Sequence, residues 1–210
     1  MTIQLKEKQF DEVFDSQAIF RNLIDAVARP GRIYTLDKIA FEHTPVDLNP
    51  FVLSVFRTLC DNNVLIGGAG FNEGWLEYLR INTATLLAAI DEADYLLFDG
   101  TLFAEDFSRL NVGDLEFPEV GATVVLLVKT LSDENGERSD SELLTLKMKG
   151  PGIKNETFLR ITGLDIKYIE TSNHLKEFYP MGVDLILLDT SGKIAAIPRS
   201  IKVEVVPWDM

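Results

Sequence analysis

Two charged residues near the end of the chain stand beside strongly apolar runs. Asp184 lies just inside the run from Val183 to Leu188, and Arg199 comes shortly after the run from Ile194 to Ile197. A charge in either place is costly to bury unless it is paired or bound to another group. Asp184 and Arg199 are therefore candidates for a buried ion pair, for contact with a partner protein, or for binding an anionic ligand.

Arg21 and Arg80 are further candidates for anion binding, because each is a charge close to a corner in an otherwise apolar segment. Arg21 stands four residues before Asp25, and residues at that spacing pair on the surface of a helix. This spacing favours a helical ion pair for Arg21 over a ligand contact, and both interpretations stay open.

The charged candidates lie near corners made of proline and glycine. The corner residues are Pro30, Gly31, Gly150, Gly152, Pro180, Gly182 and Pro198. Glycine lets a backbone turn tightly or approach a ligand closely, and proline restricts the backbone to one range of φ. Taken singly, each corner favours a rigid turn that sets the register of the neighbouring strands.

Other residue patterns give little support for self-contained catalysis. The two histidines, His43 and His174, lie far apart in the sequence, so we predict no metal site. The sequence has no phosphate-binding loop motif and no serine nucleophile elbow. Cys60 lies within an apolar helical run with no histidine close to it, which favours a buried thiol over a reactive nucleophile.

A glycine-rich stretch after residue 66 invites comparison with dinucleotide-binding motifs. The three glycines Gly68, Gly70 and Gly74 have one residue too many before the third glycine, and no strand ending in an acidic residue follows at the expected distance. We therefore interpret Gly67 to Gly70 as a connecting turn, and we predict no cofactor.

Composition limits the class of protein. The chain has 210 residues and a net charge of −13, from 33 acidic and 20 basic residues, with no cluster of Lys or Arg. A net negative charge of this size repels nucleic acid. No apolar run approaches the roughly 20 residues of a membrane helix. The amino terminus lacks the apolar core of a secretory signal, and a single cysteine suits the cytoplasm. We expect one cytoplasmic domain over residues 1–210.

Apolar periodicity predicts two long helices in the first third of the chain. The first covers Phe10 to Ala28, with Val13, Phe20, Ile24 and Val27 on its apolar stripe and Phe10 and Leu23 beside that stripe. Asp15 or Ser16 is available to cap a late start. The second opens at Asn49-Pro50, where asparagine caps and proline fits the first turn. Shorter helices are expected at Trp75 to Leu79, Ala104 to Leu110 and Asp165 to Phe178.

Strand patterns occupy much of the remainder. Predicted strands are Gly31 to Ile39, Asn63 to Ile66, Ala93 to Phe98, Ala122 to Val128, Leu143 to Met148, Phe158 to Ile161 and Ile201 to Val205. Ala122 to Val128 has the continuous apolar character of a strand covered on both faces. Asp189 to Gly192 predicts a tight turn between two apolar strands, and Asn135-Gly136 predicts another hairpin turn. The mixture of helices and strands indicates the α/β class.

Short motifs, taken in order along the chain, resemble the PhnH family of the bacterial carbon–phosphorus lyase system. The matching pieces are Phe20-Arg21 with Leu23, Ala26 and Pro30-Gly31; Pro118-Glu119 with Gly121-Ala122-Thr123; Gly150 with Gly152-Ile153; Pro180, Gly182 and Asp184-Leu185-Ile186; and Ala196-Ile197-Pro198-Arg199 with Val203-Glu204. Each piece is weak alone, and the ordered set is fairly specific. The chain departs from the family at Asn82-Thr83, where a His-Thr pair is expected.

The resemblance implies a three-layer α/β/α fold with a mixed sheet, similar to the large domain of pyridoxal-phosphate-dependent transferases but without that cofactor or its lysine. It also implies a homodimer that joins the subunits PhnG, PhnI and PhnJ in a complex that degrades phosphonates. That complex joins a phosphonate to the ribose of ATP, giving ribose 1-phosphonate 5-triphosphate, before the carbon–phosphorus bond is broken. The family member is required for the first step, and the chemistry is placed on another subunit.

Three hypotheses about function follow. The leading one is a subunit that assists this transferase and lyase complex and is not catalytic alone, with ATP or a phosphonate as a ligand to be tested. The second is a stand-alone transferase that binds a nucleotide or a phosphonate through its arginines. The third is a purely structural dimerisation module.

Overall fold

The computed structural model describes residues 9–39, 41, 48–70, 73–133 and 143–206. Its larger sheet has seven strands in the order β1-β10-β9-β5-β4-β2-β3. These strands are β1 (Tyr34–Thr35), β2 (Leu65–Ala69), β3 (Leu86–Leu87), β4 (Tyr95–Asp99), β5 (Thr123–Val128), β9 (Asp184–Asp189) and β10 (Lys193–Ile197). Strands β3, β2, β4, β5 and β9 are mutually parallel, and β10 and β1 complete the sheet in antiparallel pairs.

A second sheet has four antiparallel strands in the order β11-β7-β8-β6. They are β6 (Thr130–Ser132), β7 (Leu144–Lys149), β8 (Thr157–Thr162) and β11 (Lys202–Val206). β11 follows β10 directly, so the segment Pro198 to Ile201 carries the chain from one sheet to the other.

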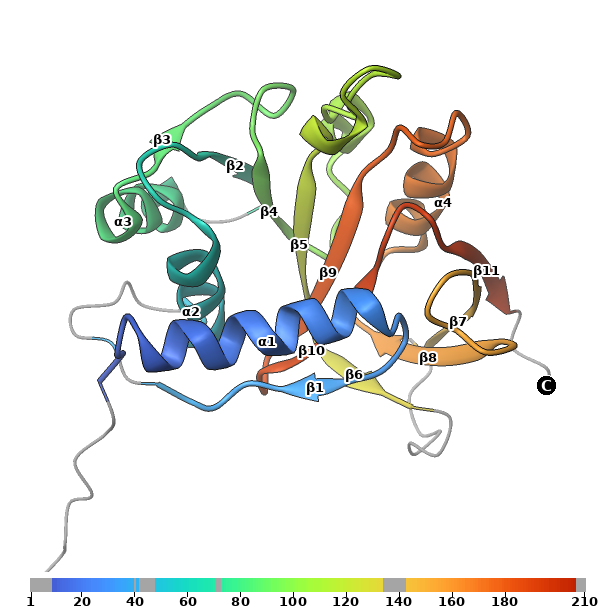
Figure 1. Ribbon diagram of the computed structural model, residues 1–210, viewed down its shortest axis with the longest axis horizontal. Helices are drawn as coiled ribbons and strands as arrows, with labels where there is room; N and C mark the ends of the chain where they lie inside the picture. Colours follow the sequence, from blue (N-terminus) through green and yellow to red (C-terminus); the bar gives the residue numbers. More distant parts are fainter. Residues whose placement is uncertain (1–8, 40, 42–47, 71–72, 134–142, 207–210) are drawn as a thin grey trace, which may run out of the picture.

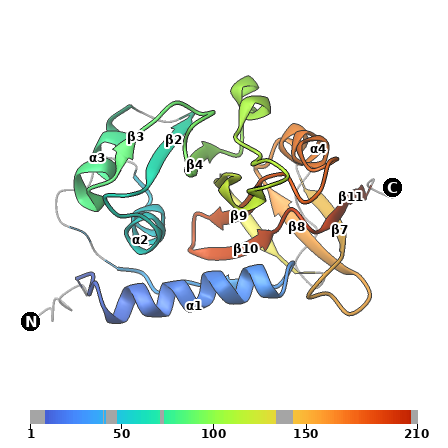
Figure 2. The same cartoon turned by 45° about the horizontal axis from the view of Figure 1, so that its top comes forward.

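Helices cover one face of the larger sheet. They are α1 (Phe14–Ala28), α2 (Pro50–Leu59) and α3 (Glu73–Thr83), and Figure 2 shows α1 lying along β10. One apolar core joins these helices to side chains of that face such as Leu97 and Val125. A second core joins the opposite face to the smaller sheet, to α4 (Ile166–Leu175) and to the 3-10 helix η1 (Glu105–Arg109).

The structure confirms the α/β class but not the expected three-layer α/β/α arrangement. The second face of the larger sheet is covered mainly by another sheet, with α4 and η1 beside it, rather than by a layer of helices. The likeness to the large domain of pyridoxal-phosphate-dependent transferases is not confirmed either. No helix in the described ranges is both long and apolar enough to cross a membrane.

The predicted hairpin near the end of the chain is confirmed. β9 and β10 pair antiparallel, with Leu188 opposite Ile194. The Asp189 carboxylate holds the turn, because its Oδ1 accepts hydrogen bonds from the backbone N–H groups of Ser191 and Lys193 at 2.8 and 2.9 Å. The Asn49 cap of α2 is confirmed as well, since its Oδ1 accepts from the Phe51 N–H at 2.9 Å.

Helix α1 differs from its prediction in its start and in its buried side. It begins at Phe14 rather than Phe10, because the Asp11 carboxylate accepts the N–H groups of Val13 and Phe14, both at 2.9 Å. The Asp15 carboxylate in turn accepts the Asp11 N–H at 2.8 Å. The predicted apolar stripe is not the buried face. Ile19, Leu23 and Ala26 are buried, whereas Phe20, Ile24 and Val27 are 48%, 50% and 44% exposed.

Two strand predictions are corrected. Gly31 to Ile39 contains only the two-residue strand β1, since the segment turns at Gly31 and pairs with β10 only at Tyr34 and Thr35. Residues 67–69, interpreted as a turn, belong to β2. Glycine is needed there because a side chain at Gly68 would collide with the Leu97 carbonyl of the adjacent strand β4. The predicted turn at Asn135-Gly136 lies outside the described residues.

Candidate functional site

Arg199 and Asp184 form an ion pair with three hydrogen bonds. The Arg199 Nε and Nη2 groups donate to Asp184 Oδ2 at 3.1 and 2.7 Å, and the Arg199 backbone N–H donates to Asp184 Oδ1 at 2.7 Å. The Arg199 side chain is 12% exposed and that of Asp184 is 30% exposed. Charge-assisted bonds of this kind are stronger than neutral ones, and here they join the start of β9 to the end of β10.

The remaining Arg199 donors bind backbone carbonyls of a distant segment. Nη1 donates to the Pro118 carbonyl at 2.5 Å, and Nη2 donates to the Gly121 carbonyl at 3.1 Å. Pro118 belongs to the short 3-10 helix η2 (Pro118–Val120), just before β5. Because a guanidinium has five N–H donors, these contacts and the Asp184 pair occupy nearly all of them.

Two glycines allow the loops around Arg199 to approach closely. A Cβ on Gly121 would lie 2.5 Å from Arg199 Nη1 and 2.5 Å from the Gly182 carbonyl oxygen. Gly182 has φ of +141°, and its N–H donates to the Val112 carbonyl at 2.9 Å. We call Arg199, Asp184, Pro118, Gly121 and Gly182 the arginine corner.

The arginine corner lies at one edge of the larger sheet. The loop 111–122 leads into β5, and the loop 176–183 leads into β9. β5 and β9 are parallel neighbours, with Thr123 opposite Asp184, so both loops meet where these strands begin, at the upper edge of the sheet in Figure 1. Arg199 thus joins the start of β9 to the loop 111–122, which is 81 residues away along the chain at Pro118. The loop 176–183 is attached to the same loop by the bond from the Gly182 N–H to the Val112 carbonyl.

Lys176 adds a second inward-facing cation beside the corner. Its Nζ donates to the Ile201 carbonyl at 2.7 Å, and a side chain on Gly182 would lie 2.9 Å from its Cβ. Burial lowers the pKa of Lys176 to about 8, while the Asp184 charge opposes that shift. Lys176 is not distinguishable as a site residue from the sequence, because a lysine after a mostly polar helix has the same sequence pattern as a surface lysine.

An apolar cleft of about 390 Å³ opens between α1 and the sheet next to the corner. Phe20, Ile24 and Val27, the residues of the predicted α1 stripe, line one wall. The opposite side includes residues at or beside the corner and on the adjacent strands: Tyr95, Thr123, Asp184, Leu185, Ile186, Ala196 and Pro198. The exposed stripe of α1 therefore faces a cleft.

The four predicted charged candidates do not form one site. Arg199 and Asp184 lie together, whereas Arg80 pairs with Glu77 on α3, with Nε 2.8 Å from Glu77 Oε2. α3 lies at the opposite end of the molecule from β11, as Figure 1 shows. Arg21 is exposed on α1, and the expected Arg21–Asp25 pair is replaced by a pair between Asp25 and Arg29.

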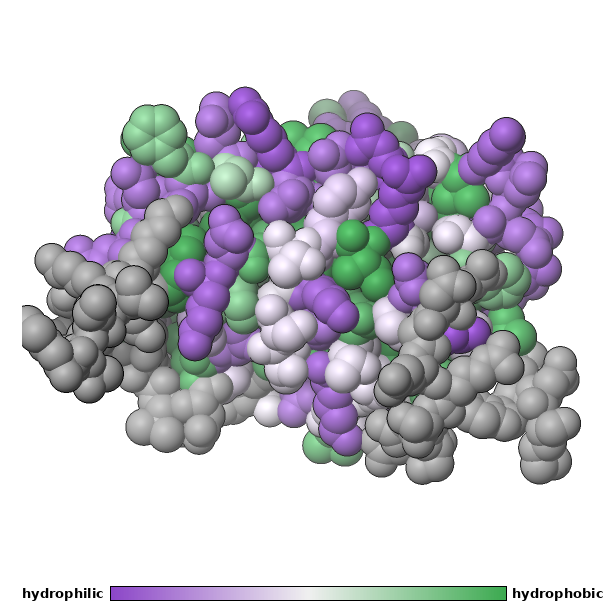
Figure 3. Space-filling view, turned by 90° about the horizontal axis from the view of Figure 1, so that it is seen from below, coloured by the Kyte–Doolittle hydropathy of each residue, from purple (hydrophilic) through white to green (hydrophobic). Residues whose placement is uncertain are grey.

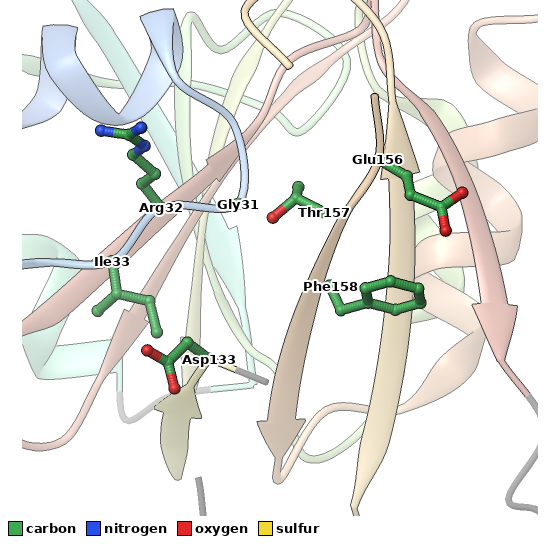
Figure 4. A pocket seen from close by; sticks show the side chains of 7 residues that line it. All are labelled: Gly31, Arg32, Ile33, Asp133, Glu156, Thr157 and Phe158. Atoms are coloured by element: carbon green, nitrogen blue, oxygen red, sulfur yellow. The ribbon is translucent and has the colours of Figure 1, made fainter. Parts of the chain in front are cut away.

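The Pro30-Gly31 corner borders a different cavity, of about 430 Å³ (Figure 4). A side chain on Gly31 would lie 2.5 Å from Thr157 Cγ2, so the corner packs closely against β8. Figure 4 shows the Arg32 guanidinium and the Glu156 carboxylate pointing away from each other, and Glu156 binds Lys147 and Lys149 instead. The charged groups here do not converge on a ligand.

The other corner glycines also have structural contacts. A Cβ on Gly150, whose φ is +148°, would lie 2.8 Å from Ile201 Cδ1. A side chain on Gly152 would collide with the Ala28 carbonyl. Pro180 follows a cis peptide bond, and the carbonyl of Pro198 accepts the Ile201 N–H at 2.9 Å.

Cys60 and the acidic residues add no reactive centre to the described part of the chain. Burial raises the pKa of the Cys60 thiol to about 12, which keeps it protonated and weakly nucleophilic at neutral pH. Within the described ranges, no three His, Cys, Asp or Glu side chains are grouped closely enough to hold a metal ion.

These features define an α/β protein with two sheets, in which the best-formed charged site is bonded to the protein's own backbone. A family model described as bacterial phosphonate metabolism protein (PhnH) matches residues 8–204. The chain therefore belongs to the PhnH family.

Two curated relatives agree with that assignment. The chain is 29% identical over 197 residues to the alpha-D-ribose 1-methylphosphonate 5-triphosphate synthase subunit PhnH of Rhizobium meliloti (strain 1021), covering 92% of each chain. It is 31% identical over 186 residues to the putative C-P lyase subunit protein HtxG of Stutzerimonas stutzeri, covering 88% of this chain and 83% of that one. Both relatives are named as subunits, one of a ribose 1-methylphosphonate 5-triphosphate synthase and the other of a C-P lyase.

Proposed function

We propose that this chain is a single-domain, cytoplasmic subunit of a carbon–phosphorus lyase complex. It assists the formation of ribose 1-phosphonate 5-triphosphate from ATP and an alkylphosphonate, and it is not catalytic alone. The observation that carries this proposal is that nearly all the side-chain donors of Arg199 are bonded to the protein itself. An arginine that stabilises a phosphate or a transition state needs free donors aimed at the ligand, and those of Arg199 are bonded to Asp184, Pro118 and Gly121.

The inward direction of Lys176 supports the same conclusion. Its amine is bonded to the Ile201 carbonyl, so Lys176 and Arg199 both donate to backbone carbonyls of the protein itself. The corner then acts as a frame that fixes the shape of a surface used by other subunits.

The decisive experiment compares the chain alone with the chain in its complex. We expect adenine release from ATP and methylphosphonate only when the remaining subunits, PhnG, PhnI and PhnJ, are added to the purified chain. We also expect deletion of its gene to abolish growth on methylphosphonate as the sole phosphorus source. Adenine release by the chain alone would support a stand-alone transferase instead, and unchanged growth after deletion would remove the proposed role.

We propose further that the chain is a homodimer and that α1 supplies the contact. Phe20, Ile24 and Val27 present an apolar stripe, and Arg21 together with the Asp25–Arg29 pair gives the same surface both signs of charge. A two-fold contact brings one surface against its own copy, and a surface with both signs can meet itself without net repulsion. Light scattering on the purified chain should give twice the monomer mass of 23.5 kDa, and an Ile24→Lys variant should give the monomer mass. A monomeric wild type would contradict the proposed homodimer. A dimeric Ile24→Lys variant would contradict the proposal that α1 forms the dimer contact.

A further inference from the structure

Exposed apolar side chains gather on the two loops that the arginine corner joins. On the loop before β5, Leu115, Phe117 and Val120 are 75%, 49% and 48% exposed. On the loop before β9, Phe178 and Tyr179 are 71% and 64% exposed. We call these five residues, together with the exposed Glu116, Glu119 and Glu177 between or beside them, the acidic apolar rim.

The loop before β5 is held in one shape by its own hydrogen bonds. Asp114 Oδ1 accepts the backbone N–H groups of Glu116 and Phe117 at 2.8 and 2.7 Å. Asn111 Nδ2 donates to the Val120 carbonyl at 3.0 Å, and Arg199 holds the carbonyls on either side of Glu119 and Val120. The exposed apolar groups therefore sit on a fixed loop, which lowers the entropic cost of binding a partner.

The charged residues of the two loop segments that carry these apolar groups are all acidic, and Glu177 also lies 3.4 Å from His174 Nδ1. Residues 111–128 contain three acidic residues and no Lys or Arg, and residues 177–183 contain Glu177 and no Lys or Arg. The nearby cations Arg199 and Lys176 donate inward to backbone carbonyls. A partner that covers the rim must bring apolar side chains and positive charge together.

Exposed apolar side chains also lie on α1, but there both signs of charge accompany them. Figure 3 shows the molecule from below, opposite to the edge where the rim lies in Figure 1, and hydrophobic residues there are scattered among hydrophilic ones. Contiguous apolar side chains rimmed by charge mark an interaction surface more strongly than scattered ones do.

We propose that the acidic apolar rim docks a basic amphipathic segment of another subunit of the complex. Apolar side chains of that segment cover Leu115, Phe117 and Phe178, and its Lys or Arg residues meet Glu116, Glu119 and Glu177. A second copy of this chain fits less well, because a two-fold contact through the rim would bring these glutamates against their own copies. The inference rests on the proposed role as a complex subunit.

The test measures the affinity of the chain for the remaining subunits, co-expressed and purified without it. We expect Phe117→Lys and the double variant Glu116→Lys/Glu119→Lys each to weaken binding at least tenfold. We also expect wild-type binding to weaken as NaCl rises from 0.05 to 0.5 M, because charged contacts at a rim are screened by salt. The matched control is Ile81→Lys, which places the same substitution at an exposed apolar residue of α3.

Circular dichroism and the unfolding midpoint establish that each variant is folded before binding is measured. If both rim variants bind the other subunits with the affinity of the wild type, the docking proposal is overturned and the proposed role as a subunit remains. If the rim variants lose dimerisation but bind the other subunits normally, the rim contacts a second copy of this chain. That result also overturns the docking proposal. Failure of the wild-type chain to bind the other subunits overturns both this inference and the proposed function.

Discussion

The Arg199 Nη2 atom lies 2.7 Å from Asp184 Oδ2, and the Arg199 backbone N–H lies 2.7 Å from the other oxygen of the same carboxylate. One carboxylate thus holds both the side chain and the main chain of its partner. This double attachment fixes the direction of the guanidinium, which then reaches the carbonyls of Pro118 and Gly121. The pair orders the loop before β5 although neither residue belongs to it.

Replacement of Arg199 should destabilise the chain strongly. Arg199→Ala removes the side-chain donors to Asp184 Oδ2 and to the carbonyls of Pro118 and Gly121, and leaves only the backbone bond to Asp184 Oδ1. Removal of one partner from a largely buried pair costs about 3 kcal/mol. Urea unfolding should show this loss in the free energy of unfolding. Arg80→Ala is the control, because the exposed Arg80–Glu77 pair contributes about 0.5 kcal/mol or less. Similar small losses of free energy of unfolding in both variants would show that the arginine corner does not stabilise the fold.

A methyl group at Gly121, on the loop that faces Arg199, should also disrupt the arginine corner. In Gly121→Ala the new Cβ would lie 2.5 Å from Arg199 Nη1 and from the Gly182 carbonyl, so the two loops must separate. We expect a loss of about 1–3 kcal/mol in the free energy of unfolding, as for other overpacked sites. The control Gly74→Ala lies at an exposed position of α3, where alanine should stabilise the helix by about 0.5–1 kcal/mol. A neutral Gly121→Ala would contradict the close contact.

The sequence predicted those parts of the fold that depend on neighbouring residues. The Asn49 cap and the β9–β10 hairpin are examples, since a cap and a tight turn are set within a few positions. The predicted apolar stripe of α1 is largely exposed, and the buried face of the helix lies beside it. Helical periodicity shows that Phe20, Ile24 and Val27 share a side, but it does not tell a core from an open cleft.

The candidate site was predictable only in part for a similar reason. The positions of Asp184 and Arg199 beside apolar runs indicated two charges that need partners, and the structure places them together. The contacts from Arg199 to Pro118 and Gly121 depend on β5 lying beside β9, and the order of strands in a sheet is not a local property of the sequence. Lys176 was missed because its burial arises from loops that are distant in sequence.

Cys60 should be unreactive in the folded chain. Cys60 is 8% exposed, and burial raises the pKa of its thiol to about 12, so little thiolate is present near pH 8. We expect iodoacetamide to label Cys60 at least a hundredfold more slowly in buffer than in 6 M guanidinium chloride at pH 8, as measured by mass spectrometry. Equal rates in the two conditions would mean that the thiol is accessible and that this segment opens readily.

Lys176 should make the stability of the chain depend on pH in the alkaline range. Its folded pKa of about 8 lies below the unfolded value of 10.5, so between these two pH values the unfolded chain binds more protons than the folded one. The contribution of Lys176 to stability therefore rises as the pH increases from 8 towards 10.5, and it is lost as the pH falls back through 8. Because the side chain is partly exposed, we expect a change of about 1–2 kcal/mol.

The measurement compares the wild type with Lys176→Met by urea unfolding at pH 7.5 and pH 10. The free energy of unfolding of the wild type relative to the variant should increase at the higher pH, because only the wild type releases this proton on folding. The exposed Lys202→Met variant is the control for loss of one positive charge. A difference between wild type and Lys176→Met that stays constant with pH would show that the Lys176 amine is solvated, and the bond to the Ile201 carbonyl would then not hold β11 to the corner.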